Sequence, residues 1–166
     1  YRREVLMHEG LDFPEGLIYE DTAFYIKTIP YVQQAAYLDE SFVYYFLRGN
    51  STMNANKSKK VGDIFQVMQN ILKFYHTHGF YEAYAKELEY FCVKIALCSS
   101  LSRIGRVTDK ELEGQLLDET FAFIHDNFPE YKKNPYFNGK IGLYIKNVNR
   151  FNSKYLGRIL GKVMKG

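Results

Sequence analysis

The chain has 166 residues, 46% of them hydrophobic, and a net charge of +3, which is typical of a globular protein with one sizeable core. No apolar run reaches the roughly 18 residues that a membrane-spanning helix requires. The two cysteines, Cys92 and Cys98, are too few for a disulfide framework and lack the spacing of a zinc site. We therefore expect a soluble, cytoplasmic protein in which both thiols are buried.

The first predicted elements are two short helices. One covers about residues 1–10, and a loop that contains Gly16 follows it. The second helix begins at Glu20 and Asp21, and its apolar positions repeat on one face. It ends at Pro30, because proline cannot continue a helix.

Residues 35–48 are rich in β-forming side chains, and a polar stretch at residues 39–41 interrupts them. This pattern predicts two short strands around a turn. A loop extends from there to about residue 56. We place the division of the chain in this loop, with mixed helix and strand in residues 1–56 and helix alone in residues 57–166.

Three antiparallel helices are predicted after the loop. The first two cover about residues 57–78 and 81–104, with apolar side chains repeating every three to four positions and a glycine after each helix. Thr108 and Glu111 have the T-x-x-E pattern of a capping box and predict the start of the third helix, which runs until Pro129.

The last segment, about residues 138–165, is predicted to be a basic amphipathic helix or a pair of helices. All 19 acidic residues lie at or before Glu130, so the tail is purely basic. Its basic side chains either form a solvated face over the tail's own core or lie on an anionic membrane, where each contributes about 1 kcal/mol. The G-x-x-x-G spacing of Gly157 and Gly161 predicts close helix packing.

Nucleic acid is not an expected partner of the basic tail. Clustered lysines and arginines can neutralise phosphates, but no recognisable reading element accompanies them. The acidic remainder of the chain would also repel a polyanion.

The run FPEGLIYEDTAFYIKTI, followed by YLDESFVYYFLRGNSTM, resembles the second half of bacterial family 2, GT-A type, inverting glycosyltransferases. These enzymes build capsule, exopolysaccharide and wall polymers. The resemblance implies a mainly α chain, in which a short α/β remnant of a GT-A domain (a helix plus two short strands, residues 1–56) precedes a helical bundle extension (residues 57–166). The nucleotide-binding half, with its Asp-x-Asp metal site, has no counterpart in the sequence, so the fragment alone is expected to be inactive.

The resemblance implies that Glu20 and Asp21 are the catalytic residues. Inverting transfer needs a carboxylate that takes the proton of the acceptor hydroxyl as its oxygen attacks the anomeric carbon, and Asp21 is the predicted base. Neighbouring helical residues point about 100° apart, so Glu20 is expected to orient the acceptor or brace the loop. The alternative is that two acids in a first turn only favour the helix dipole, by about 0.3–1 kcal/mol each.

Four further residues receive roles from the same resemblance. Arg48 and Ser51 are expected to bind the donor diphosphate through charge-assisted hydrogen bonds, although an exposed loop arginine is the simpler alternative. Tyr19 and Tyr45 are expected on the acceptor side.

The expected partners are a nucleotide sugar donor and a glycan or lipid-linked acceptor. Mn²⁺ or Mg²⁺ is expected in the intact enzyme, with its ligands mostly in the missing half, and no metal site is expected in this chain. The enzyme is expected in the cytoplasm, and it is peripheral at the inner face of the membrane if the basic tail lies on anionic lipid. The competing hypothesis is a non-catalytic helical module that docks on a membrane or a partner enzyme, which would not need Glu20 and Asp21.

Overall fold

The computed structural model describes residues 3–8, 11–44, 46 and 59–163. The secondary structure of this part of the chain is helical, and the helices include 3₁₀ segments (η1, η3 and η5) and one π segment (η4). In chain order the elements are α1 (Arg3–His8), α2 (Glu20–Thr28), η1 (Ile29–Tyr31), η3 (Lys59–Gly62), α3 (Asp63–Thr77), α4 (Tyr81–Lys94), η4 (Ile95–Ser100), α5 (Leu101–Ile104), α6 (Lys110–Asn127), η5 (Tyr131–Lys133), α7 (Gly139–Asn147) and α8 (Arg150–Val163).

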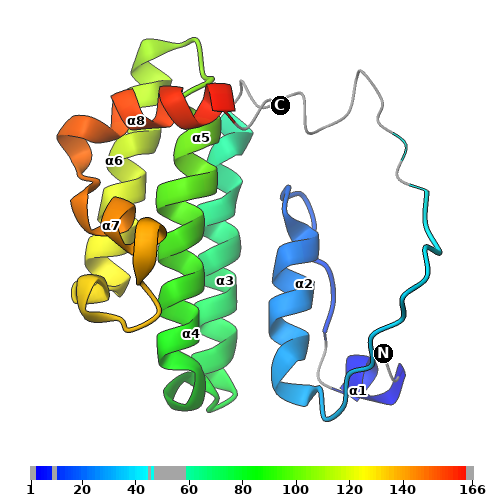
Figure 1. Cartoon of the computed structure of the whole chain (residues 1–166). Coiled ribbons are helices and arrows are strands. Elements are labelled where there is room, and N and C mark those ends of the chain that lie inside the picture. The colour runs from blue at the N-terminus through cyan, green and yellow to red at the C-terminus, as the bar shows by residue number, and fades with distance from the viewer. Residues whose placement is uncertain (1–2, 9–10, 45, 47–58, 164–166) are drawn as a thin grey trace.

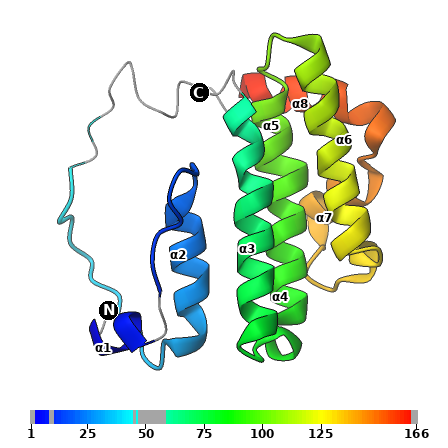
Figure 2. The same cartoon turned by 180° about the vertical axis from the view of Figure 1, so that it is seen from behind.

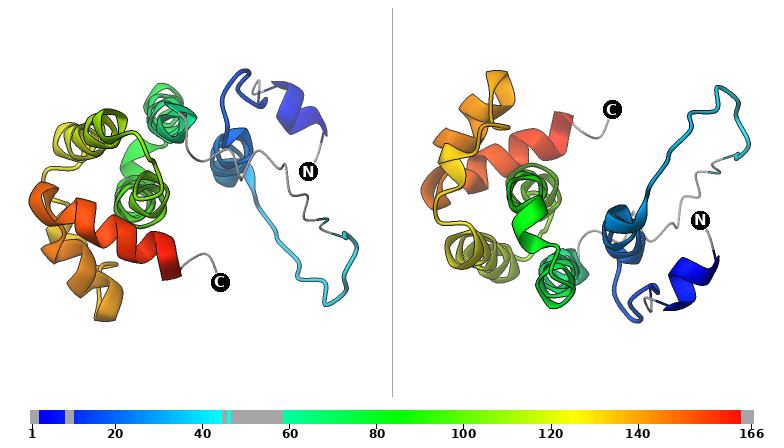
Figure 3. Two further views of the ribbon diagram at one scale, coloured as in Figure 1. Left: turned by 90° about the horizontal axis from the view of Figure 1, so that it is seen from above. Right: turned by 90° about the horizontal axis from the view of Figure 1, so that it is seen from below.

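An antiparallel bundle of α3, the continuous α4–η4–α5 helix and α6 forms the body of the molecule (Figure 1). Helix α8 crosses one end of this bundle, as the view along the helices shows (Figure 3). Helix α2 lies against the outer side of α3 and runs in the same direction (Figures 1 and 2). The mainly α architecture and the three antiparallel helices agree with the prediction.

The apolar repeat of α3 explains the position of this helix at the centre of the core. Its hydrophobic side chains recur every three to four residues and face α2, α4 and α6 together. The helix ends at Thr77, and Gly79, two residues later, has a φ of 73° in the left-handed region that favours glycine. The buried residues of α3 are Ile64, Phe65, Val67, Met68, Ile71, Leu72 and Tyr75.

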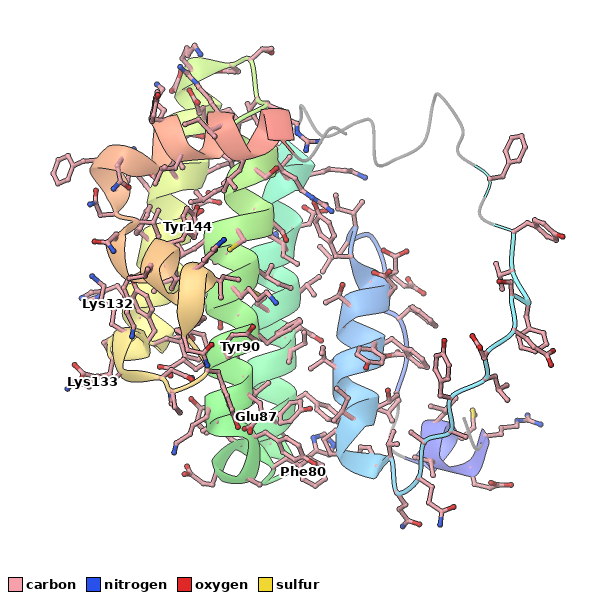
Figure 4. The ribbon with its side chains drawn as sticks, viewed as in Figure 1. Phe80, Glu87, Tyr90, Lys132, Lys133 and Tyr144 are labelled. Atoms are coloured by element: carbon pink, nitrogen blue, oxygen red, sulfur yellow. The ribbon has the colours of Figure 1, made fainter. Side chains whose placement is uncertain are left out.

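The second predicted helix forms, but a π segment, η4, interrupts its α-helical hydrogen bonding. A π turn is wider than an α turn, because its backbone hydrogen bonds join residues five positions apart instead of four. The Tyr144 hydroxyl of α7 donates to the carbonyl of Leu97 in η4, at 2.6 Å. Figure 4 shows Tyr144 directed from α7 toward this helix. The hydrogen bond attaches α7 to the bundle.

Helices α5 and α8 cross at two glycines. A Cβ atom on Gly105 would lie 2.4 Å from the carbonyl carbon and oxygen of Gly157, and a Cβ on Gly157 would lie 2.6 Å from the carbonyl oxygen of Leu101. The two backbones are therefore in direct contact. The prediction of close helix packing is confirmed at Gly157, and its contact is with α5.

The start of α6 differs from the predicted capping box. The N-cap residue is Asp109, whose carboxylate accepts hydrogen bonds from the backbone amides of Glu111 and Leu112, at 2.9 and 3.2 Å. Aspartate is among the most favourable N-cap residues. The cap thus lies one residue after Thr108.

The prediction of two short strands over residues 35–48 is wrong for the part that the structure describes, because residues 35–44 and 46 contain no strand. Side-chain preference favours an extended backbone, but a strand also needs a neighbour with which to pair. The hydrophobic side chains here face solvent, with Tyr44 fully exposed and Val43 82% exposed. The proposed division at about residue 56 lies outside the described residues.

The basic tail forms two helices, α7 and α8, and part of its charge binds α6. Glu113 of α6 is only 1% exposed, and its carboxylate lies 3.1 Å from the guanidinium of Arg158 and 3.2 Å from the ammonium of Lys154. Arg150 pairs with Asp118 at 2.5 Å. These ion pairs attach α8 to α6. No helix in the described part of the chain is long and apolar enough to cross a membrane.

Candidate functional site

Helix α2 is fixed along α3 by contacts at both of its ends. The backbone amide of Ile18 donates to the carboxylate of Asp63 in the first turn of α3, at 3.2 Å. Near the other end, the buried Tyr75 hydroxyl donates to the carbonyl of Ile26, at 2.8 Å. Ala23, between them, is fully buried. The first turn of α2 therefore lies at the end of the bundle where α3 begins and α5 ends (Figure 1).

Glu20 and Asp21 occupy this first turn, as predicted. Both side chains are exposed. The Asp21 carboxylate accepts hydrogen bonds from the backbone amide and the hydroxyl of Thr22, at 2.8 and 3.4 Å. Local backbone contacts of this kind orient the carboxylate and leave its outer edge open to a bound molecule.

Tyr19, the residue before the pair, has a strained backbone and a half-buried side chain. Its φ of 71° is the only positive value for a non-glycine residue in the described part of the chain. Such a conformation costs on the order of 1–3 kcal/mol and persists only where the surroundings enforce it. The guanidinium of Arg103 lies 4.5 Å from the centre of the Tyr19 ring, within the range of a cation–π contact.

Arg103 and Arg106 are two functional candidates that the sequence alone did not indicate. They lie one turn apart where α5 ends, and Arg106 donates to the hydroxyl of the buried Ser102, at 3.3 Å. Arg103 Nη1 and Arg106 Nε are shielded from solvent and have no hydrogen-bond partner. The segment LSRIGR contains two arginines at the end of an apolar helix, but nothing in its spacing relates it to residue 19.

The structure thus brings Tyr19, the residue before Glu20 and Asp21, into contact with Arg103, and Arg106 lies one turn further along the chain. Exposed carboxylates can accept a proton from a bound hydroxyl group. Guanidinium groups with free N–H donors can hold an anion through charge-assisted hydrogen bonds. These groups are suited to a reaction in which a carboxylate takes a proton from a bound hydroxyl while an arginine holds a negatively charged group.

The structure does not place the other predicted site residues beside Glu20 and Asp21. Tyr45, Arg48 and Ser51 lie outside the described residues, so their roles remain predictions. Among the residues that are described, no three potential ligands of the His, Cys, Asp and Glu types gather into a metal site.

A hollow of about 730 Å³ lies at the opposite end of α2. It is bounded by α1, by η1 and by the extended segment that follows, and none of the described residues that line it is charged. It is therefore separate from the Glu20 and Asp21 turn. Its lining residues are Val5, Leu6, Thr28, Tyr31, Val32, Gln33, Gln34, Ala35 and Ala36.

Comparison of the chain with protein-family models, with curated proteins and with solved structures finds no match. The functional assignment therefore depends on the residues of this chain and on their arrangement.

Proposed function

We propose that this chain is the acceptor-side part of an inverting glycosyltransferase. The intact enzyme would transfer a sugar from a nucleotide sugar to a polysaccharide or lipid-linked glycan of the cell surface. The observation that carries the proposal is the placement of the exposed Glu20 and Asp21 turn beside Tyr19 and Arg103. A carboxylate base next to an anion-binding group suits a reaction in which a hydroxyl loses a proton and a phosphate departs.

In the proposed reaction, Asp21 accepts the proton of the acceptor hydroxyl. The hydroxyl oxygen forms a bond to the anomeric carbon, and the bond from that carbon to the donor phosphate breaks on the opposite face. The electron pair of the broken bond leaves with the nucleoside diphosphate. Glu20 orients the acceptor, and Arg48 and Ser51 contact the departing diphosphate. The donor pocket and any metal ligands belong to a part of the enzyme outside these residues.

The exposed segment after η1 supports an enzyme with a further part. Tyr37, Phe42, Val43 and Tyr44 are 68–101% exposed along an extended backbone without a paired strand. Exposed apolar runs of this kind mark interaction surfaces. We propose that residues 1–56 complete a catalytic domain with the donor half, and that residues 57–166 form its helical extension.

The catalytic role can be tested with Asp21→Asn in the intact enzyme that contains this chain. The variant should lose about 10²–10⁴-fold in turnover while it still binds the nucleotide sugar, because only the base is removed. Glu82→Gln is a matched control, since Glu82 is an exposed acid in the first turn of α4. If Asp21→Asn retains the turnover of the Glu82→Gln control, the two acids serve only the helix dipole.

A second candidate function, docking on an anionic membrane, is favoured by the outer face of α8. Phe151, Tyr155 and Ile159 recur at four-residue steps and are 97%, 70% and 42% exposed. They point away from Gly157, which faces α5. An apolar stripe on a helix without acidic residues is typical of a helix that lies in a membrane interface. This would place the enzyme at the inner face of the membrane, near lipid-linked acceptors.

Vesicle sedimentation tests this second function without removing α8 from the fold. Phe151→Ser together with Tyr155→Ser should reduce binding to vesicles rich in phosphatidylserine by more than tenfold. Val43→Ser, which removes a similarly exposed apolar side chain elsewhere, should leave binding unchanged. Equal binding by both variants and the parent chain would exclude α8 as the docking element.

A further inference from the structure

Three buried polar atoms in the described part of the chain lack a hydrogen-bond partner: Tyr19 Oη, Arg103 Nη1 and Arg106 Nε. A buried polar group without a partner costs about 1–3 kcal/mol, and more if it is charged. Native proteins leave few such groups, and each one needs an explanation. Tyr19 and Arg103 meet where α2 contacts the end of α5, and Arg106 follows Arg103 by one turn.

The chemistry of the three groups indicates which kind of hydrogen-bond partner they would bind. A guanidinium has only donors, and a phenol hydroxyl can donate. The absent partner must therefore be an acceptor, and two guanidinium groups favour a negatively charged one. Arginine pairs best with planar or tetrahedral oxyanions, above all phosphate, because its N–H groups form a rigid fork.

The surrounding contacts hold the donors in place. The Tyr19 ring packs against the guanidinium of Arg103, with 4.5 Å between guanidinium carbon and ring centre. Arg106 Nη2 donates to Ser102 Oγ at 3.3 Å, and Ser102 is 1% exposed. The unusual φ of Tyr19 sets the direction of its side chain. These contacts engage one part of each side chain and leave Nη1, Nε and the hydroxyl unpaired.

Among the described residues, no ion pair joins Arg103 or Arg106 to a carboxylate. The carboxylate of Asp63, in the first turn of α3, accepts a hydrogen bond from the backbone amide of Ile18. The buried Glu113 of α6 pairs with Lys154 and Arg158 of α8. The guanidinium groups of Arg103 and Arg106 thus have no carboxylate partner among the described residues.

We infer that Arg103, Arg106 and the Tyr19 hydroxyl form a binding site for the phosphate group of a phosphorylated ligand. The site depends on these three groups and not on catalysis by Asp21. In the proposed transferase, one of these three groups, the Tyr19 hydroxyl, belongs to the residue directly before the carboxylate pair. A nucleoside diphosphate and the phosphate of a lipid-linked acceptor share this chemistry.

Calorimetric titration of the chain with inorganic phosphate and with pyrophosphate tests the site at low salt. Saturable binding is expected, and Arg103→Gln and Arg106→Gln should each weaken it by tenfold or more. Tyr19→Phe, which keeps the ring beneath Arg103, should weaken it about threefold. Arg150→Gln is the matched control and should bind like the parent chain, because Arg150 already pairs with Asp118.

Circular dichroism of each variant verifies that the helices remain. If an arginine variant does not fold, the parent chain and Tyr19→Phe still decide the question, because the site requires saturable binding that weakens when the hydroxyl is removed. Absence of saturable binding by the parent chain, or equal binding by the folded variants and Arg150→Gln, overturns the proposal.

Parallel titrations with uridine diphosphate and with a short-chain alkyl phosphate distinguish the two sources, and tighter binding of one identifies the donor or the acceptor as the ligand. Asp21→Asn should bind phosphate normally. Normal phosphate binding together with full transferase activity in Asp21→Asn would refute the catalytic proposal alone.

Discussion

Gly157→Ala should destabilise the fold strongly, because α8 crosses α5 at this glycine. The new Cβ atom would lie 2.6 Å from the carbonyl oxygen of Leu101 and 3.4 Å from its carbonyl carbon. The obstructing atoms belong to the backbone of a helix, so no side-chain rotation relieves the contact. Helix α8 must move away from α5, and the buried Glu113 carboxylate then loses contact with Arg158 and Lys154.

The magnitude follows from two opposing effects. Alanine is a better helix former than glycine by about 0.5–1 kcal/mol, which favours the variant. Overpacking at a tight contact costs about 1–3 kcal/mol. The cost of Gly157→Ala should lie at the upper end of that range, because the obstructing atoms are backbone atoms and the ion pairs of Glu113 are weakened as well. The expected net loss in the free energy of unfolding is about 2 kcal/mol.

Gly114→Ala is the matched control, since Gly114 lies inside α6 and its Cβ would meet nothing within 4 Å. Only the higher helix propensity of alanine acts at this position, so the free energy of unfolding of this variant should rise by about 0.5–1 kcal/mol. Urea unfolding followed by circular dichroism at 222 nm measures both changes. A difference of about 1 kcal/mol in stability corresponds to roughly 2–4 °C in Tm for a chain of this size. If both variants change stability in the same direction, the crossing of α5 and α8 at Gly157 is refuted.

Two further predictions concern a helix cap and a buried phenol. Asp109→Ala should lower the free energy of unfolding by about 1 kcal/mol, because two amides of α6 lose their acceptor, whereas Thr108→Ala should change it by less than about 0.5 kcal/mol; equal urea midpoints would contradict the observed cap. Burial raises the pKa of Tyr144 above its ordinary value of 10.0, so the phenol stabilises the fold below pH 10 and loses that contribution as the pH rises further. Tyr144→Phe should lower the free energy of unfolding by about 1 kcal/mol at pH 7, because the hydrogen bond to Leu97 is lost. The free energy of unfolding of this variant should also fall less between pH 9 and 11 than that of the parent chain. An equal fall in both proteins would contradict the role of the buried phenol.

The sequence was most informative where local patterns decide structure. The repeat of apolar residues in α3, from Ile64 to Tyr75, requires one face to be buried, and Gly79 permits the left-handed backbone that ends the helix. Glu20 and Asp21 were likewise predicted at a helix start, where the structure has them. The cap at Asp109 was missed by one residue, because neighbouring polar side chains compete for the same amides and only the backbone geometry decides between them.

Tertiary structure decided whatever depends on a distant partner. Residues 35–44 have the side chains of strands but no neighbouring strand within the described chain, so composition predicted a local preference and not a pairing. The contact of Tyr19 with Arg103 spans more than eighty positions, and no spacing in the sequence encodes it. The sequence by itself determined the helices and the acidic turn, because these follow from local periodicity and capping. The contact between that turn and Arg103 exists only because α2 packs along α3 and places Tyr19 at the end of the bundle where α5 ends.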